Sequence, residues 1–216
     1  EEIHSINNPD SIIFSNVFRF NIDFKNAVKL VFDAINRKEK VCIFGDYDVD
    51  GSCATALIIK FFKSIDHPHF YLIPDREKDG YGLNVKLVKK IIKEQPKLII
   101  MVDNGSNSTK EINLLKENRI DTLVIDHHQI NEPFPKANVI INPKKNNGYI
   151  KKDYMCATLL TFFFIDLLKE KITTNFHLYD YLIYPLMATI CDVMPLRNVN
   201  RFLAIYALKK FDLKKV

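Results

Sequence analysis

Residues 41–51, VCIFGDYDVDG, join a run of four apolar side chains to a loop that carries three aspartates. The apolar run predicts a short buried strand, and Asp46, Asp48 and Asp50 follow its carboxyl end. A helix is expected after this loop, from Ser52 to about Ser64. The same order of strand, polar loop and helix recurs along the chain. Continuous apolar strands that alternate with helices indicate a parallel sheet covered on both faces.

Apolar runs and helical periodicity predict the other elements of the chain. Strands are expected at residues 41–44, 70–73, 98–102, 122–125 and 139–141. Helices are expected at residues 26–37, 52–64, 85–93, 154–168, 179–191 and 200–211, with one more that begins at Ser108. The expected fold class is α/β, with a doubly wound, mainly parallel five-stranded sheet, helices on both faces and a helical C-terminal part.

Two local patterns predict details of these helices. Ser108 and Glu111 have the spacing of a capping box, in which each side chain bonds the backbone N–H of the other residue. Pro185 is expected either to kink the helix around it or to lie in the first turn of that helix.

The chain has 216 residues, no internal repeat and no convincing linker, so we expect a single catalytic domain over residues 1–216. Within it we expect an N-terminal lead-in and helix (1–40), an α/β core (41–143) and a helical part (144–216). The connection at residues 144–153 is polar and rich in lysine and asparagine. Its lysines are better explained as a solvated loop than as a binding site.

The composition excludes several classes of protein. With 47% hydrophobic and 26% charged residues the chain is neither disordered nor fibrous. Its longest apolar stretch, residues 159–168, already contains Thr161 and Asp166, so no membrane span is expected. The four cysteines are scattered in apolar segments without a C-x-x-C pair, which favours free thiols and a cytoplasmic location. The net charge of +5 is only weak support for a polyanionic partner.

Acidic and imidazole side chains follow three of the predicted strands. Besides the first acidic loop, Asp103-Asn104-Gly105 follows the third strand and Asp126-His127-His128 follows the fourth. In open parallel sheets, ligands bind at the carboxyl ends of the strands. One aspartate at such a place is better explained as a helix cap or a turn residue. The whole set would repel itself strongly unless a cation neutralised it.

The donor types favour a particular class of cation. Carboxylates with one or two imidazoles and no nearby thiolate suit Mn²⁺ or Mg²⁺ better than Zn²⁺. The acids also exceed the needs of one ion, whereas two ions about 3.5–4 Å apart would activate water for in-line displacement at phosphorus. Asp192 lies at the end of an apolar helix, where its charge opposes the helix dipole, so it is a further candidate ligand.

Glycine is scarce, with 6 residues where average usage gives about 15. Five of the six lie in the strand-end loops, where the backbone must turn tightly or approach a ligand. The loop at residues 74–82 also carries Arg76 and Tyr81, which are candidates to clamp a phosphate and to stack on a base. A surface ion pair with Glu77 or Asp79 explains Arg76 equally well. Arg201 is a second candidate for a phosphate contact.

Four ordered motifs resemble those of the DHH phosphoesterase superfamily. They are residues 44–51, Val102-Asp103-Asn104-Gly105, Asp126-His127-His128, and Asp192 before Val193-Met194-Pro195-Leu196. The Asp-Tyr-Asp-x-Asp-Gly form and the loop from Ile73 to Gly82 are most similar to the RecJ single-strand-specific exonucleases. The resemblance covers about residues 40–205.

This resemblance implies a 5′→3′ exonuclease on single-stranded DNA in recombination and repair, with two divalent cations, Mn²⁺ or Mg²⁺. The implied metal-site residues are Asp46, Asp48, Asp50, Asp103, His127 and Asp192. The implied catalytic residues are Asp48, Asp50, Asp103, His127 and His128, of which His128 orients the site or contacts the scissile phosphate. The expected substrate-binding residues are Arg76, Tyr81, Gly82, Asn104, Gly105 and Arg201.

Departures from the family pattern leave alternatives open. Phe44 stands where some relatives have a histidine, so either Asp46 takes that role or one metal binds weakly. We expect the family's C-terminal associated domain and an OB-fold to be absent, and therefore expect metal binding with weak or no processive activity. One alternative is a hydrolase of oligonucleotides, cyclic dinucleotides or pyrophosphate from the same superfamily. A non-catalytic DHH scaffold is an alternative of another class.

Overall fold

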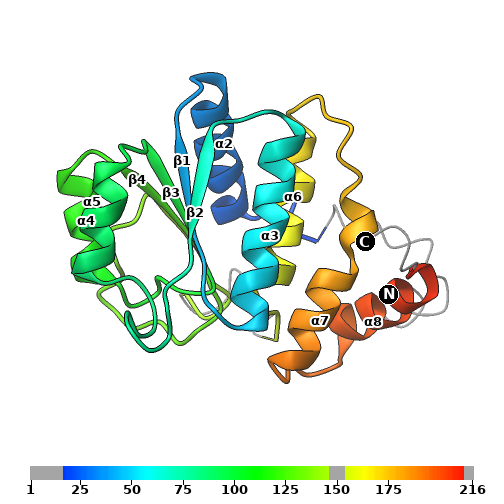
Figure 1. Cartoon of the computed structure of the whole chain (residues 1–216). Coiled ribbons are helices and arrows are strands. Elements are labelled where there is room, and N and C mark those ends of the chain that lie inside the picture. The colour runs from blue at the N-terminus through cyan, green and yellow to red at the C-terminus, as the bar shows by residue number, and fades with distance from the viewer. Residues whose placement is uncertain (1–16, 146–153, 212–216) are drawn as a thin grey trace.

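A computed structural model describes residues 17–145 and 154–211 of the chain. Its centre is a five-stranded sheet with the strand order β2-β1-β3-β4-β5, in which every neighbouring pair is parallel (Figure 1). The strands are β1 (Val41–Phe44), β2 (His69–Leu72), β3 (Leu98–Val102), β4 (Asp121–Ile125) and β5 (Val139–Ile141). Because all strands run the same way, the loops after β1, β3 and β4 leave the same edge of the sheet.

Helices cover both faces of this sheet, as the sequence predicts (Figure 1). They are α2 (Ile22–Asn36), α3 (Val49–Ser64), α4 (Val85–Lys93), α5 (Thr109–Glu117), α6 (Ala157–Lys169), α7 (Ile183–Cys191) and α8 (Asn198–Lys210), with the 3₁₀ helix η4 (Leu178–Tyr181). The core residues of α2, α3 and α6 pack with one face of the sheet, and those of α4 and α5 pack with the other. Since both faces are covered, β1 and β3 are buried along their whole length.

A hydrophobic core lies on each face of the sheet, and alternate strand residues pack into one core or the other. On β1, Val41 and Ile43 belong to the larger core, whereas Cys42 and Phe44 belong to the smaller one. This alternation follows from the two-residue period of a strand. Phe44 is therefore a fully buried packing residue with its side chain away from solvent.

Several helix boundaries differ from the sequence prediction. Helix α2 begins four residues earlier than expected, because the Asn21 side chain accepts hydrogen bonds from Asp23 N and Phe24 N at 2.9 and 3.1 Å. Helix α6 starts at Ala157 instead of 154, and the segment predicted as one helix at 179–191 divides into η4 and α7. Pro185 lies in the first turn of α7, where a missing N–H costs nothing.

The capping box predicted for α5 does not form. Ser108 is the N-cap residue, but its side chain makes no cap hydrogen bond, and its backbone N–H donates to Gly105 O at 3.1 Å instead of to Glu111. The ψ of 46° at Ser108 is far from the extended backbone that N-cap residues usually adopt. The side chains of Ser108 and Glu111 are consequently left without a hydrogen-bond partner among the described residues.

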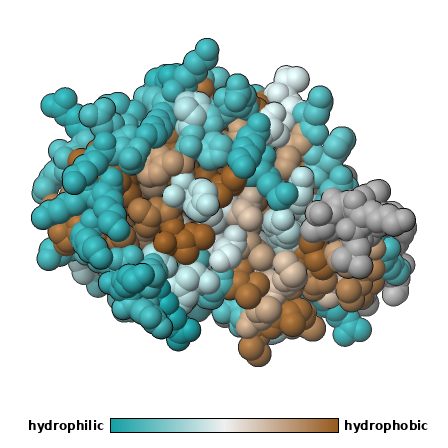
Figure 2. Space-filling model, viewed as in Figure 1, coloured by the Kyte–Doolittle hydropathy of each residue, from teal (hydrophilic) through white to brown (hydrophobic). Residues whose placement is uncertain are grey.

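An apolar surface region lies on α7 and the turn that follows it. Met187, Ile190, Val193 and Leu196 are all exposed there, and Figure 2 shows apolar side chains gathered at this lower edge of the molecule. Within the described residues no helix is long and apolar enough to cross a membrane. All four cysteines are free thiols, and three of them are buried.

Candidate metal centre

The strand order brings the predicted acids to one place. Because β1, β3 and β4 are adjacent and parallel, Asp46, Asp103 and Asp126 leave neighbouring strand ends. All three side chains are at most 2% exposed. Helix α7 ends on the same region and contributes Asp192 as its C-cap residue.

Asp48 and Gly51 form the start of α3 inside the acidic loop. The Asp48 side chain caps the helix by accepting a hydrogen bond from Gly51 N at 2.9 Å, so the helix begins at Val49, three residues before the predicted Ser52. Gly51 lies directly against Asp46, and a Cβ at Gly51 would be 2.6 Å from both the Asp46 Cβ and its backbone nitrogen. The loop is therefore folded back on itself so tightly that only glycine fits at this position.

Replacing Gly51 by alanine tests this packing. A backbone neighbour at 2.6 Å has no rotamer to change, so the loop itself must shift. We expect Gly51→Ala to lower the free energy of unfolding by about 1–3 kcal/mol and to displace Asp46. Chemical denaturation measures the change, with Ser52→Ala as the control at the next residue. Equal stability of the two variants would contradict the close approach.

Asp50 has a structural role that the sequence does not indicate. Its two carboxylate oxygens accept hydrogen bonds from Ala157 N and Thr158 N, both at 2.7 Å, and its carbonyl accepts the Thr158 hydroxyl at 2.7 Å. Asp50 thus caps the N-terminus of α6 across 107 residues of sequence. One of its oxygens also lies 3.5 Å from His127 Nε2, so the cap borders the acidic cluster.

Asp103 is the least satisfied acid of the cluster. It is 1% exposed, its φ of +61° places it in the left-handed region, and neither carboxylate oxygen has a hydrogen-bond partner. Burial raises the pKa of Asp103 far above its ordinary value, and the neighbouring Asp50 and Asp48 raise it further. An orphaned buried carboxylate among other acids is the environment that a bound cation would stabilise.

His127 lies at the centre of the cluster. Its Nε2 is 3.2 Å from Asp103 Oδ1 and 3.5 Å from Asp192 Oδ2, and neither ring nitrogen has a hydrogen-bond partner. Burial lowers the pKa of His127, which favours the neutral imidazole that ligates metals. Burial also raises the pKa of Asp192, whose side chain is 31% exposed at the rim.

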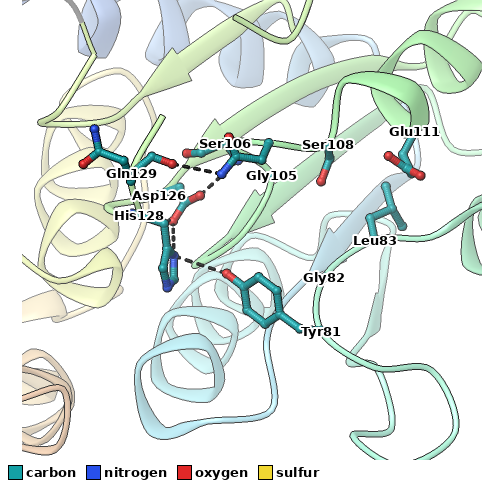
Figure 3. Close-up of a pocket in the computed structure, with 11 residues that line it drawn as sticks. Tyr81, Gly82, Leu83, Gly105, Ser106, Ser108, Glu111, Asp126, His128 and Gln129 are labelled. Carbon is teal, nitrogen blue, oxygen red and sulfur yellow. Dashed lines mark hydrogen bonds and ion pairs between the residues drawn. The ribbon is translucent and has the colours of Figure 1, made fainter. Parts of the chain in front are cut away.

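His128 is held by a separate network that is centred on Asp126. Asp126 Oδ1 contacts His128 Nδ1 at 2.7 Å and also accepts the backbone N–H groups of His127 and His128, while Oδ2 accepts Ser106 N at 3.0 Å (Figure 3). Although burial opposes it, these hydrogen bonds hold the pKa of Asp126 below its usual range and raise that of His128. Asp126 is therefore an anchor of the loop, with both oxygens engaged.

Asn142 and Thr158 also belong to this region, although neither is a predicted site residue. Asn142 is 1% exposed and donates to Ser106 Oγ at 2.7 Å and to His128 O at 2.9 Å, so it joins the loops after β3, β4 and β5. Its signal is its position directly after β5, because the acids of the site also follow strand ends. Thr158 has no such signal, because it meets Asp50 only through the packing of α6 on α3.

Three groups of ligand atoms are close enough to hold ions. Within each group one atom from every residue lies within 4.8 Å of the others. The groups are Asp46, Asp48 and Asp103; Asp50, His127 and Asp192; and Asp103, His127 and His128. Asp103 belongs to two of the groups, and His127 also belongs to two. The carboxylate oxygens of Asp103 and the ring nitrogens of His127 have no hydrogen-bond partner among the described residues, which fits ligands of divalent cations.

The structure separates the residues predicted to bind substrate. Arg76 is exposed and stacks over the Tyr47 ring at 5.5 Å, while Asp75 pairs with Lys78 and Asp79 with Lys86. The alternative ion pair of Arg76 with Glu77 or Asp79 is thus not formed among the described residues. Its guanidinium therefore stays on the same acidic loop that carries the metal-site candidates.

Tyr81, the candidate to stack on a base, contacts two other residues of the site. Its hydroxyl donates to Asp103 O at 3.2 Å and lies 3.2 Å from His128 Nδ1, and its ring meets the His128 ring edge-on (Figure 3). The side of the ring away from His128 remains open, since Tyr81 is 55% exposed. Gly82, the next residue, lines the same pocket as Tyr81.

The other three candidates have local structural explanations. Asn104 is buried and donates its side-chain amide to Val102 O at 2.8 Å. Gly105 has a φ of +103° and is closely packed against Met101 and Val124. Arg201 is exposed on α8, and no hydrogen bond or ion pair within the described residues joins it to the acidic cluster.

The sequence that forms this site matches a known protein family. Residues 40–189 match the DHH family, N-terminal domain. The chain belongs to the DHH family. It is 31% identical to the single-stranded-DNA-specific exonuclease RecJ of Haemophilus influenzae over 195 residues, and 28% identical to that of Bacillus subtilis over 186 residues. These matches cover 86% of this chain but 34% and 23% of the relatives, so the chain spans about a third of their length or less.

Solved structures give the same result for the fold. A crystal structure of exonuclease RecJ bound to manganese matches with a TM-score of 0.78 and 25% identity, and covers 87% of this chain and 47% of that one. RecJ from Thermus thermophilus in complex with Mn²⁺ matches with a TM-score of 0.74 and 23% identity, and covers 88% and 27%. The α/β fold with its parallel sheet is therefore the fold of the RecJ DHH domain.

Proposed function

We propose that this chain is the metal-dependent phosphodiesterase domain of a RecJ-like 5′→3′ exonuclease that acts on single-stranded DNA. The observation that carries the proposal is the close contact of two buried side chains, Asp103 and His127. The carboxylate oxygens of Asp103 and the ring nitrogens of His127 have no hydrogen-bond partners within the described part of the chain. Membership of the DHH family and the likeness to RecJ exonucleases support this choice of chemistry. The preference for single strands rests on the relatives alone, and the 5′→3′ polarity rests only on the resemblance of the motifs to the RecJ exonucleases.

Two divalent cations, Mn²⁺ or Mg²⁺, suit the donor set. Asp46, Asp48 and Asp103 would hold one ion, and His127 and Asp192 would hold the other beside Asp50. Asp103 would be available to more than one ion position, because it alone among the carboxylates belongs to two of the groups. When bound, such ions lower the pKa of water and neutralise the charge that develops on a phosphodiester.

The chain's own residues prepare the site for this reaction. The hydrogen bond from His128 Nδ1 to the Asp126 carboxylate raises the pKa of His128, so the protonated ring can donate from Nε2 to a phosphate oxygen. His127 stays neutral because of its burial, so its lone pair is available to a cation. Asp50 holds α6, and through it the helical part, against the acidic loop.

We propose different roles for the residues that were predicted to bind substrate. Arg76 is an exposed guanidinium over Tyr47, and we propose that it contacts a phosphate. Tyr81 and Gly82 form a wall of the adjoining pocket. Asn104 and Gly105 shape the backbone, and Arg201 remains a candidate for a more distant phosphate. Because all four cysteines are free thiols, the proposal includes a cytoplasmic location.

The test is cleavage by excess chain in a single turnover, which requires no processive action. With Mn²⁺, 5′-labelled single-stranded DNA should release labelled mononucleotide, whereas duplex DNA, dinucleotides and pyrophosphate should remain largely intact. Cleavage of only dinucleotides or pyrophosphate would establish the small-substrate hydrolase instead. Absence of any cleavage together with no Mn²⁺ binding by calorimetry would establish a scaffold.

A further inference from the structure

A pocket of about 410 Å³ lies beside the candidate metal centre but outside its cluster of acids. Tyr81, Gly82 and Leu83 form one wall, and residues 105–108 with Glu111 form another (Figure 3). Asp126, His128 and Gln129 complete it, so His128 is shared with the metal centre. The volume falls within the range of about 300–1,000 Å³ that is typical of small-molecule sites.

The chemistry of the walls selects the kind of group that fits. Leu83 and the ring of Tyr81 are apolar surfaces, and the Ser108 hydroxyl and the Glu111 carboxylate are polar groups. Glu111 is acidic and is not paired with a lysine, arginine or histidine among the described residues, whereas both oxygens of Asp126 are already engaged. An unpaired carboxylate on the wall disfavours an anion such as phosphate. A neutral, flat heterocycle with N–H donors matches the same walls.

The failed capping box explains why Glu111 is available. In a capping box the glutamate would bond the backbone N–H of Ser108, but that N–H donates to Gly105 O at 3.1 Å. Ser108 and Glu111 instead lie half-buried in the pocket wall, and Figure 3 shows Glu111 on the same side as Leu83. The pair that the sequence presents as a helix cap therefore faces a binding pocket.

We propose that this pocket seats the base of the nucleotide whose phosphodiester is cleaved, and that Glu111 selects bases with an exocyclic amino group. The inference rests on the proposed nuclease function, because His128 is what joins the pocket to the scissile phosphate. A carboxylate accepts a hydrogen bond from the N4 amino group of cytosine. Uracil presents a carbonyl oxygen at that position, which a carboxylate repels.

Two mononucleotides of equal size provide the test. With Mg²⁺ present, dCMP should bind this chain about tenfold more tightly than dUMP, and it should shift the backbone amide resonances of Leu83, Ser108 and Glu111. Glu111→Ala should reduce the difference to less than about twofold. Glu117→Gln, at the other end of α5 and outside the pocket, should leave it unchanged.

Each other outcome has a definite meaning. Equal binding of dCMP and dUMP, or a preference that survives Glu111→Ala, would overturn the proposal even if the chain cleaves DNA. Inorganic phosphate that competes with dCMP and shifts the same three amides would make the pocket an anion site and would also overturn it. Selective dCMP binding without any DNA cleavage would uphold the pocket and reject the nuclease function.

Discussion

Asp103→Asn is expected to abolish metal-dependent cleavage and, at the same time, to stabilise the metal-free protein. The carboxylate is 1% exposed and has no hydrogen-bond donor, so without a cation it costs the fold free energy. An amide of the same shape removes that cost. We expect the free energy of unfolding to rise by about 1–3 kcal/mol, which corresponds to roughly 2–4 °C in Tm for each kcal/mol.

The loss of function should be larger than the effect of removing a residue that only orients a ligand. Such outer partners cost about 10–100-fold in metal affinity or activity, so the variant should lose more than about 100-fold in both. Thermal unfolding with and without Mn²⁺ measures the two effects together, because a ligand that binds only the folded state raises its Tm. The variant should unfold at a higher temperature without Mn²⁺ and show almost no rise with it.

Asp33→Asn is the matched control for the change of charge. Asp33 pairs with Lys29 on the exposed surface of α2, where such pairs contribute only a few tenths of a kcal/mol. It should change neither the Mn²⁺ response nor the activity. If Asp103→Asn lowered the stability of the metal-free protein, the Asp103 carboxylate would have a stabilising partner within the protein. Its assignment as a cation ligand would then be wrong.

The sheet and the place of the site follow from short-range patterns in the sequence. Runs such as 98–102 are apolar without interruption, which identifies strands buried on both faces. Acids at the ends of such strands then meet at one edge, because parallel strands share their direction. This reasoning predicts that Asp46, Asp103 and His127 lie together, and in the structure Asp103 forms one ligand group with Asp46 and another with His127.

What the sequence does not contain is the set of contacts between distant segments. The capping box at Ser108 satisfies a local pattern, yet the turn from Gly105 takes the N–H that the box requires. Asp48 and Asp50 look equivalent in Asp-x-Asp, but one caps its own helix and the other caps α6. Their different roles depend on tertiary packing, which no local spacing encodes.

Asp50→Asn is therefore expected to act in the opposite direction to Asp103→Asn. Both Asp50 oxygens accept backbone N–H groups at 2.7 Å, and an asparagine has only one oxygen to offer. Its NH₂ group would face the other N–H donor in a buried place. We expect the free energy of unfolding to fall by about 2–4 kcal/mol, and hydrogen exchange at Ala157 and Thr158 to become much faster than at amides in the middle of α6.

The direction of the change in stability distinguishes two possible roles of Asp50, metal ligand and cap of α6, which the sequence motif does not distinguish. If Asp50 were only a metal ligand, its removal would relieve repulsion and stabilise the metal-free protein, as for Asp103. Since it caps α6, the variant should be less stable both with and without Mn²⁺, while the rise in Tm on adding Mn²⁺ is partly kept. Thr158→Val removes one contact with the Asp50 carbonyl and leaves the carboxylate in place, so it should destabilise less and keep the full Mn²⁺ response. A metal-free Asp50→Asn variant more stable than the parent chain would refute the cap and return Asp50 to the ligands.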